Sequence, residues 1–387
     1  MRTNAITYIP YKDRIQTKVI PPCQLKKDTV NFEGKLSLTS KYGIDVKKVI
    51  INKTDNVGEI SKDLIKTLIE KILEGHEHAR KNMLSKNIAN SAYATNIGTS
   101  TGQWGLASNF NNTRDEISAV CGERSAILVA YNKFLHAIRL NKKIKQPEFS
   151  VDYIAMSSYK EVGSDHFAIY PCADCLSWFN TTRYFHDTTI IAGLKKNDNN
   201  YHLILRTLKD YLPLRNEKTS ILKDNETIKD LFFEATKHAR GIMVERNITK
   251  EQLEQLFLKA KADYDITAPA EAMKCNLSAG ILDVNNRITT GRKQSWTTRW
   301  FTEPAEFALA KLLEQQPNIK QLNALAYYGD SNNNSVVNIK TLGLLLSKFE
   351  DPNILIITQV DNKLKIRTIN DYLPQEYGYI PSYKRKK

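Results

Sequence analysis

The sequence predicts an α/β protein in which one domain of roughly 150 residues occurs twice in tandem. The chain has 387 residues, more than one compact core usually holds. Two short motifs recur in the same order: His78-Ala79-Arg80 returns 160 residues later at 238–240, and Asp210-Tyr211-Leu212-Pro213 returns 161 residues later at 371–374. Both halves also alternate helix-like and strand-like segments, which favours a sheet with helices packed on it.

Apolar periodicity and turn residues predict the elements of each half. The first half gives a helix from near Ser61 to Arg80, a hairpin over 92–109, a helix over 121–138, a strand over 151–156, a helix from Cys172 and a strand over 189–193. After a helix over 228–239, the second half repeats this order over 279–290, 304–313, 323–328, 342–349 and 354–359.

Three segments follow from this reading. Residues 1–57 contain Pro10, Pro21 and Pro22 and have little helical periodicity, so we interpret them as an irregular extension that packs on the body. Residues 58–218 form the first predicted domain and residues 219–387 form the second.

The composition is that of an ordinary soluble globular protein, with 41% hydrophobic and 25% charged residues. No apolar run is long enough to span a bilayer, and the first residues lack the apolar core of a signal peptide. We therefore expect a cytoplasmic protein without a membrane partner. The five cysteines are too few and too unevenly spaced for a disulfide framework.

The formal net charge is +14, which favours polyanionic partners such as nucleic acid. The alternative is that a lysine-rich composition raises the charge on every face. Basic residues cluster only briefly, at 142–145 and 384–387, without forming a long stripe. The second interpretation is therefore favoured.

Three of the cysteines have the spacing of a metal site. Cys172 and Cys175 lie three residues apart at a predicted helix start, where free N–H groups and the helix dipole favour thiolates. Together with Cys121 they would give Zn²⁺ three protein ligands and leave the fourth position open to water, as a catalytic zinc requires. Glu123 is placed to take a proton from this activated water and pass it to a substrate.

A closed zinc site or a pair of buried thiols is the alternative for these residues. Cys-x-x-Cys alone would favour that alternative. The additional Cys121-x-Glu123 pattern and Pro171 favour a catalytic site, because a structural zinc has no use for a free carboxylate two residues from its ligand.

Here the chain resembles a known family. Cys121-Gly122-Glu123-Arg124-Ser125-Ala126 is similar to the C-A-E-R-T-A motif of cytidine deaminases, and Pro171-Cys172-Ala173-Asp174-Cys175 is similar to their P-C-x-x-C motif. The resemblance is strong over residues 60–215 and weak over 225–375. It implies, for each domain, a mixed five-stranded sheet with helices on both faces in three layers. It also implies Zn²⁺ as cofactor, Glu123 as general acid and base, and a homodimer.

The resemblance also suggests substrate-binding residues. Segment 108–112 is similar to the family's N-V-E-N segment, which binds ribose hydroxyls, so Asn109 and Asn111 become candidates. Asn111 stands where the family has Glu, and an amide lacks the charge that strengthens a hydrogen bond to a hydroxyl. The alternative is a polar turn between a strand and a helix.

The second half lacks the metal ligands. Alignment of the two halves places Pro304 at the position of Cys121, and Leu342 and Leu345 at the positions of the other two thiolates. Glu306, at the position of Glu123, would then be a structural carboxylate. Tyr377 or Tyr379 could cover an active site, as a terminal aromatic does in the family; the alternative is that both pack on their own domain.

The sequence thus predicts zinc-dependent hydrolytic deamination of a free cytosine nucleoside, as in pyrimidine salvage. A deaminase acting on cytosine in RNA or single-stranded DNA is the first alternative, motivated by the net charge. In polynucleotide deaminases the corresponding motif is generally His-x-Glu, whereas this chain has Cys121-x-Glu123. Nucleic acid is therefore the less favoured partner. A zinc-stabilised binding protein without activity is the second alternative.

Overall fold

The structure is a computed structural model, and it describes residues 26–31, 48–86, 92–109, 121–140, 148–159, 166–167, 171–197, 200–215, 217, 228–266, 277–292, 294–297, 300–329, 337–360 and 363–374. These residues fall into two compact units. The N-terminal unit takes the described residues of 23–217, 333–352 and 372–387. The C-terminal unit takes those of 218–332 and 353–371.

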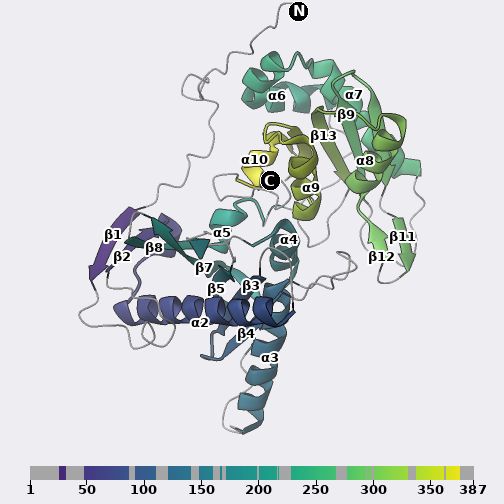
Figure 1. The fold of residues 1–387 in the computed structure, drawn as a ribbon. Helices are drawn as coiled ribbons and strands as arrows, with labels where there is room; N and C mark the ends of the chain where they lie inside the picture. Colours follow the sequence, from purple (N-terminus) through teal and green to yellow (C-terminus); the bar gives the residue numbers. More distant parts are fainter. Residues whose placement is uncertain are drawn as a thin grey trace, which may run out of the picture. The chain divides into compact units, whose positions relative to one another are not determined.

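The N-terminal unit is built on a mixed sheet (Figure 1). The strand order is β1-β2-β8-β7-β5-β3-β4, with β6 paired to β7. The strands are β1 (Lys26–Asn31), β2 (Lys48–Lys53), β3 (Ala92–Thr99), β4 (Trp104–Ser108), β5 (Val151–Tyr159), β6 (His166–Phe167), β7 (Phe185–Asn197) and β8 (Asn200–Thr207). The pairs β2–β8 and β5–β7 are parallel, and the other pairs are antiparallel.

Helices of the N-terminal unit cover both faces of this sheet. The helices of the unit are α2 (Lys62–Lys86), α3 (Gly122–Leu140), α4 (Ala173–Thr181), α5 (Leu208–Tyr211) and α9 (Ile339–Phe349), with the short helix η2 (Asp55–Val57). A Cβ added at Gly75 of α2 would lie 3.8 Å from Cβ of Ala94, and one added at Gly105 of β4 would lie 2.3 Å from the backbone nitrogen of Ala130 in α3. Gly105 is in register with Ile97, three residues from Ala94, so α2 and α3 lie on opposite faces.

The core under α2 includes part of the segment predicted as an extension. Val49 and Ile51 of β2 are buried together with the apolar stripe of α2, formed by Leu68, Ile69, Ile72 and Leu73. β2 pairs with β8 through Val49 to Lys53. Residues 48–53 are therefore a strand of the sheet, because their alternating β-branched side chains fill the space between α2 and the sheet.

The C-terminal unit has a sheet of five strands in the order β10-β9-β13-β14-β15. Its elements are α6 (Ile228–Glu245), α7 (Lys250–Ile266), β9 (Leu277–Asp283), β10 (Ile288–Arg292), α8 (Pro304–Gln315), β13 (Leu322–Gly329), β14 (Leu355–Val360), β15 (Lys363–Thr368) and α10 (Ile369–Tyr372). β11 (Gln294–Thr297) and β12 (Trp300–Thr302) form a separate two-stranded sheet.

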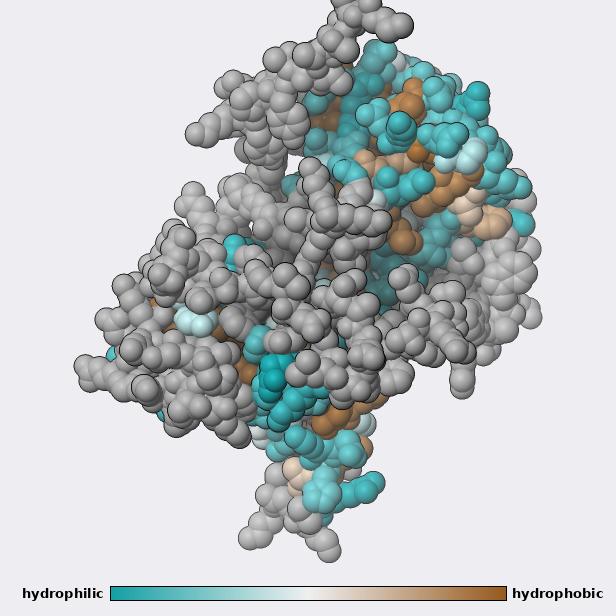
Figure 2. Space-filling model, in the orientation of Figure 1, coloured by the Kyte–Doolittle hydropathy of each residue, from teal (hydrophilic) through white to brown (hydrophobic). Residues whose placement is uncertain are grey.

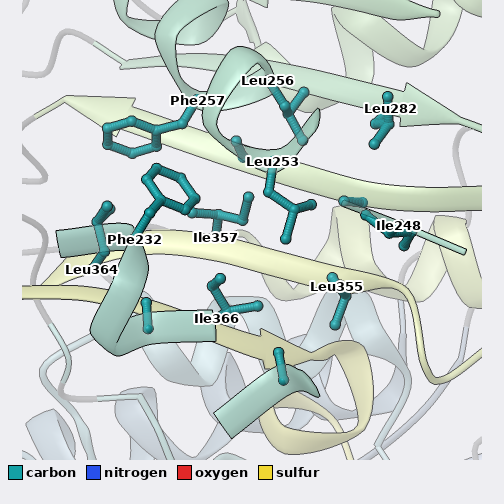
Figure 3. Close-up of a cluster of buried hydrophobic side chains, with 14 of the residues drawn as sticks. Phe232, Ile248, Leu253, Leu256, Phe257, Leu282, Leu355, Ile357, Leu364 and Ile366 are labelled. Carbon is teal, nitrogen blue, oxygen red and sulfur yellow. The ribbon is translucent and has the colours of Figure 1, made fainter. Parts of the chain in front are cut away.

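Helices again cover both faces of the five-stranded sheet. A Cβ added at Gly280 would meet the Leu256 side chain of α7 at 2.8 Å, and one added at Gly291 would meet the backbone nitrogen of Ala308 in α8 at 2.5 Å. Gly291 is in register with Ala279, the neighbour of Gly280, so the two helices lie on opposite faces. Figure 3 shows side chains of α6 and α7, among them Phe232, Leu253 and Phe257, packed with Ile357 and Ile366 of β14 and β15.

The two sheets share one topology. The strands β8-β7-β5-β3-β4 correspond in order and direction to β15-β14-β13-β9-β10. The α/β class is therefore confirmed. Five strands were predicted for each sheet, and the second sheet has them. The first sheet has eight among the described residues, because β1, β2 and β6 are added to the shared five.

One of the two repeated motifs marks equivalent positions. In the first copy the backbone nitrogen of Thr207 donates to Oδ2 of Asp210 at 2.7 Å, and in the second copy Thr368 donates to Asp371 in the same way, also at 2.7 Å. The His-Ala-Arg motif does not mark equivalent positions. Its first copy lies in α2, which packs on β3 and β5. The strands equivalent to these, β9 and β13, are covered by α7, whereas the second copy lies in α6, which packs on β15. Ala79 and Ala239 share only burial of a small residue on an amphipathic helix.

The described surface is mostly hydrophilic on the face drawn in Figure 2, with smaller hydrophobic areas between the hydrophilic side chains. Among the described helices, none combines the length and the apolar character required to cross a bilayer.

Candidate metal centre

The starts of α3 and α4 carry the three cysteines. Cys121 immediately precedes α3, whose first residue is Gly122. Cys172 is the N-cap of α4, in the extended conformation, and its sulfur accepts a hydrogen bond from the backbone nitrogen of Cys175 at 3.4 Å. A helix start leaves backbone N–H groups without intrahelical partners, which favours negative charge on the sulfurs placed there.

The structure brings the three sulfur atoms together. The Sγ atoms of Cys121 and Cys172 are 3.7 Å apart, and all three Sγ atoms lie within 4.8 Å of one another. A tetrahedral zinc ion with Zn–S bonds of about 2.3 Å requires its sulfur ligands to be ~3.8 Å apart. The three sulfurs could therefore hold one metal ion, and the Cys121–Cys172 distance is the one that zinc requires. Cys175 is fully buried, whereas the other two cysteines are half-buried.

The sulfurs perturb one another's protonation. Hydrogen bonds from the thiols of Cys172 and Cys175 lower the pKa of Cys121 to about 4. The same bonds to Cys121 raise the pKa of Cys172 and of Cys175, and burial adds to both increases. Negative charge is thus held first on Cys121, the sulfur at the start of α3. A cation is the partner that would let all three sulfurs ionise.

Glu123 lies in the first turn of α3, beside the sulfurs. Its side chain is only 6% exposed. Burial raises the pKa of Glu123 to about 7, and the nearby charge of Cys172 acts in the same direction. A carboxyl group with a pKa near neutrality can both accept and donate a proton at physiological pH.

Arg124 connects the two helix starts. Its Nη2 donates to the backbone oxygen of Asp174 in α4 at 3.2 Å. The bond ties the helix of Cys121 and Glu123 to the helix of Cys172 and Cys175. Sequence reasoning gave Arg124 no role, although it stands next to Glu123 in the motif and was visible there.

The two predicted substrate-binding residues have different outcomes. Asn109 is buried at the end of β4, and a Cβ added at Gly122 would lie 3.3 Å from its backbone nitrogen, so Asn109 adjoins the start of α3. Its Oδ1 accepts a hydrogen bond from the backbone nitrogen of Tyr93 at 2.9 Å, which holds the ends of β3 and β4 together. Asn111 lies outside the described residues, as do Tyr377 and Tyr379.

The positions that sequence alignment of the two halves pairs with the three cysteines are apolar. Pro304, Leu342 and Leu345 are buried, and Glu306 is half-exposed on α8. Among the described residues, the three cysteines are the one group of His, Cys, Asp and Glu side chains whose ligand atoms converge closely enough to hold a metal ion.

Comparisons with known proteins give a partial likeness. No protein-family model matches the chain. No curated protein matches it. Solved structures of cytidine deaminases are similar to parts of it. The enzyme from Burkholderia pseudomallei has 15% identity and a TM-score of 0.27, over 31% of this chain and 94% of that one. The enzyme from Mycobacterium leprae has 17% identity and a TM-score of 0.26, over 32% and 98%. At these values the assignment of function depends on the site itself.

Proposed function

We propose that this protein is a zinc-dependent hydrolytic deaminase of a cytosine nucleoside. The observation that supports this is the convergence of three thiol sulfurs within 4.8 Å of one another. The buried carboxyl group of Glu123 lies beside them but is not part of this group of ligand atoms. A closed structural site would use four protein ligands, whereas a catalytic site keeps one position open. The residues of 58–218 would then form the catalytic domain, and those of 219–387 a degenerate copy.

Cys121, Cys172 and Cys175 would hold the metal ion. When bound, zinc supplies a Lewis acid that makes water a nucleophile at neutral pH. The thiols lose their protons on binding, so the site takes up metal more readily as the pH rises. Arg124 would keep the two helix starts together as the metal binds, through its hydrogen bond to the Asp174 carbonyl.

Glu123 would move the protons of the reaction. Hydrolytic deamination forms a C–O bond from water to C4 of the cytosine ring and breaks the C4–N bond, releasing ammonia. Glu123 would take one proton from the water and pass it to the ring nitrogen, and would then take the remaining proton of the hydroxyl added at C4 and pass it to the departing amine. Burial suits Glu123 to this role, because its raised pKa lets it hold and release a proton near pH 7.

The substrate in this proposal is a free cytidine or deoxycytidine, and the expected assembly is a homodimer. Asn109 is the candidate for contact with the sugar, and its support is that its backbone nitrogen adjoins Gly122, the residue after Cys121. Deamination of cytosine in a polynucleotide is the alternative that the net charge of +14 favours.

Replacement of Glu123 tests the proposal. Glu123→Gln should bind one zinc per chain as the wild type does, and release ammonia from cytidine at least 100-fold more slowly, because general acid–base catalysis contributes about 10²–10⁴-fold. Glu306→Gln is the matched control and should leave the rate unchanged. Turnover by Glu123→Gln at the wild-type rate would contradict the mechanism.

The substrate class is tested by competition in the same ammonia assay. Cytidine, deoxycytidine, their monophosphates and single-stranded oligonucleotides are compared at one salt concentration. The proposal expects turnover of a free nucleoside. Turnover of oligonucleotides alone, with affinity that falls steeply as salt rises, would replace it with the polynucleotide alternative. Zinc binding without turnover of any of them would favour a binding protein.

A further inference from the structure

The helix that begins at the two neighbouring metal ligands, Cys172 and Cys175, packs against a helix from the other half of the sequence. α4 is largely covered: among Ala173–Thr181, Thr181 is the one exposed residue, and the others are buried or partly buried. Its principal neighbour among the described helices and strands is α9. By sequence α9 lies between β13 and β14 of the second repeat, yet residues 333–352 belong to the compact unit that holds the metal ligands.

The contact between the two helices involves the cap of α9. Asn338 is the N-cap of α9, and its Oδ1 accepts hydrogen bonds from the backbone nitrogens of Lys340 at 2.9 Å and Thr341 at 3.4 Å. The same oxygen accepts a hydrogen bond from Oγ of Ser177 in α4 at 3.4 Å. The start of α9 therefore meets α4 five residues after Cys172, about 8 Å along the helix axis.

The apolar side of α9 is buried. Its buried residues are Ile339, Thr341, Leu342, Gly343, Leu345, Leu346 and Phe349. Sequence alignment of the two halves pairs Leu342 and Leu345 with Cys172 and Cys175. In the structure, however, the N-cap of α9 is Asn338, whereas that of α4 is Cys172. The buried side of α9 is thus mostly apolar, which suits it to packing and not to binding an ion.

We propose that α9 is a positioning element of the metal centre: it holds α4 so that Cys172 and Cys175 meet Cys121 at the spacing a metal ion requires. The inference rests on the proposed metal site, and it explains why a second repeat without ligands is retained. Ligand distances at a metal are tolerated only within about 0.2 Å, so a small shift of α4 lowers affinity.

The first test places a large side chain at the contact. Ser177→Arg in the full chain should push α9 from α4 and weaken binding of Co²⁺ or Zn²⁺ by about 10- to 100-fold, the usual effect of disturbing the support of a metal ligand. Ser177→Ala should bind as the wild type does, because the helices stay in contact. Thr181→Arg, on the exposed side of the same helix, is the matched control. Circular dichroism verifies that each variant is folded.

The second test needs no variant. In the wild-type chain, removal of zinc by a chelator should increase hydrogen exchange of the α9 amides, because coupling between the metal and α9 is reciprocal. The amides of α7, in the other unit, should keep their protection. Wild-type metal affinity in folded Ser177→Arg, or identical exchange of α9 with and without zinc, would overturn the proposal.

Both readouts are independent of turnover. If the chain binds metal and responds as expected but releases no ammonia from any cytosine substrate, the deaminase function fails and the role of α9 stands. If the chain deaminates cytidine and Ser177→Arg binds metal normally, the role of α9 fails and the deaminase function stands.

Discussion

At the scale of single residues, the site depends on groups that hold the ligands as well as on the ligands. Arg124 is the clearest of them, since its guanidinium donates to the carbonyl of Asp174 and so joins α3 to α4. Arg124→Ala should lower the affinity for zinc by about 10- to 100-fold, measured by competition with a chelator. Leu128→Ala, an exposed position on the same helix, is the control. Equal affinity in the two variants would exclude this role for Arg124.

His76 makes the stability of the N-terminal unit depend on pH. Its Nδ1 lies 2.8 Å from the carbonyl oxygen of Ser158, and burial lowers the pKa of the ring below its ordinary value of 6.5. The unfolded chain therefore binds a proton more readily than the folded one. The contribution of His76 is present above pH 6.5 and is lost as the pH falls below that value.

Urea unfolding at several pH values between about 7.5 and 5.5 checks this sign. The wild type should lose stability across that range, and His76→Gln should lose less. His136→Gln, at an exposed ring on α3, should follow the wild type. A steeper decline in His76→Gln than in the wild type would show that the sign is wrong.

The residues of the metal centre could be predicted because their spacing is local. Cys121 with Glu123, and Cys172 with Cys175, are each close in sequence and are residue types that a catalytic metal site uses. That the two pairs meet across 51 residues depends on the packing of α3 and α4. The role of Arg124 could not be predicted in the same way. Its partner is a backbone oxygen 50 residues away, which depends on how α3 and α4 pack.

At the scale of elements, close packing at glycine fixes where α3 lies. A Cβ added at Gly105 would be 2.3 Å from the backbone nitrogen of Ala130 and 2.4 Å from the backbone oxygen of Ala126. Gly105→Ala must therefore displace α3, and with it Cys121 and Glu123. We expect a loss of about 1–3 kcal/mol in the free energy of unfolding, together with weaker zinc binding.

The control for Gly105→Ala is Leu128→Ala, which changes the same helix where it faces solvent. Urea unfolding gives the free energies, and chelator competition gives the zinc affinities. If Gly105→Ala were as stable as the control, α3 would not lie against β4 as described.

The sequence predicts several elements correctly and misses two, the helix α7 and the strand β2. The hairpin over 92–109 and the helix from residue 121 agree with β3, β4 and α3. The helix α7 was missed, although Thr249 and Gln252 form a reciprocal capping box at its start. The sequence places strand β2 in an irregular extension, because a six-residue segment does not reveal its pairing with β8 about 150 residues away.

At the scale of the whole molecule, one topology serves two purposes. The sheets β8-β7-β5-β3-β4 and β15-β14-β13-β9-β10 have the same order, but ligands for a metal converge in one of them among the described residues. Leu342 and Leu345, which the sequence alignment pairs with two of the thiolates, are buried, and their apolar surface stabilises α9 by packing. The internal repeat was visible in the sequence through the Asp-Tyr-Leu-Pro motif, whereas the assignment of α9 to the metal-binding unit required the fold.

The central claim is that three sulfurs of one repeat bind a single zinc ion and leave one position open. X-ray absorption at the zinc edge, on the full chain with its metal content measured, tests this directly. The account predicts one zinc per chain with three sulfur neighbours at about 2.3 Å and one oxygen or nitrogen neighbour. Four sulfur neighbours, two zinc ions per chain, or no retained zinc would contradict it.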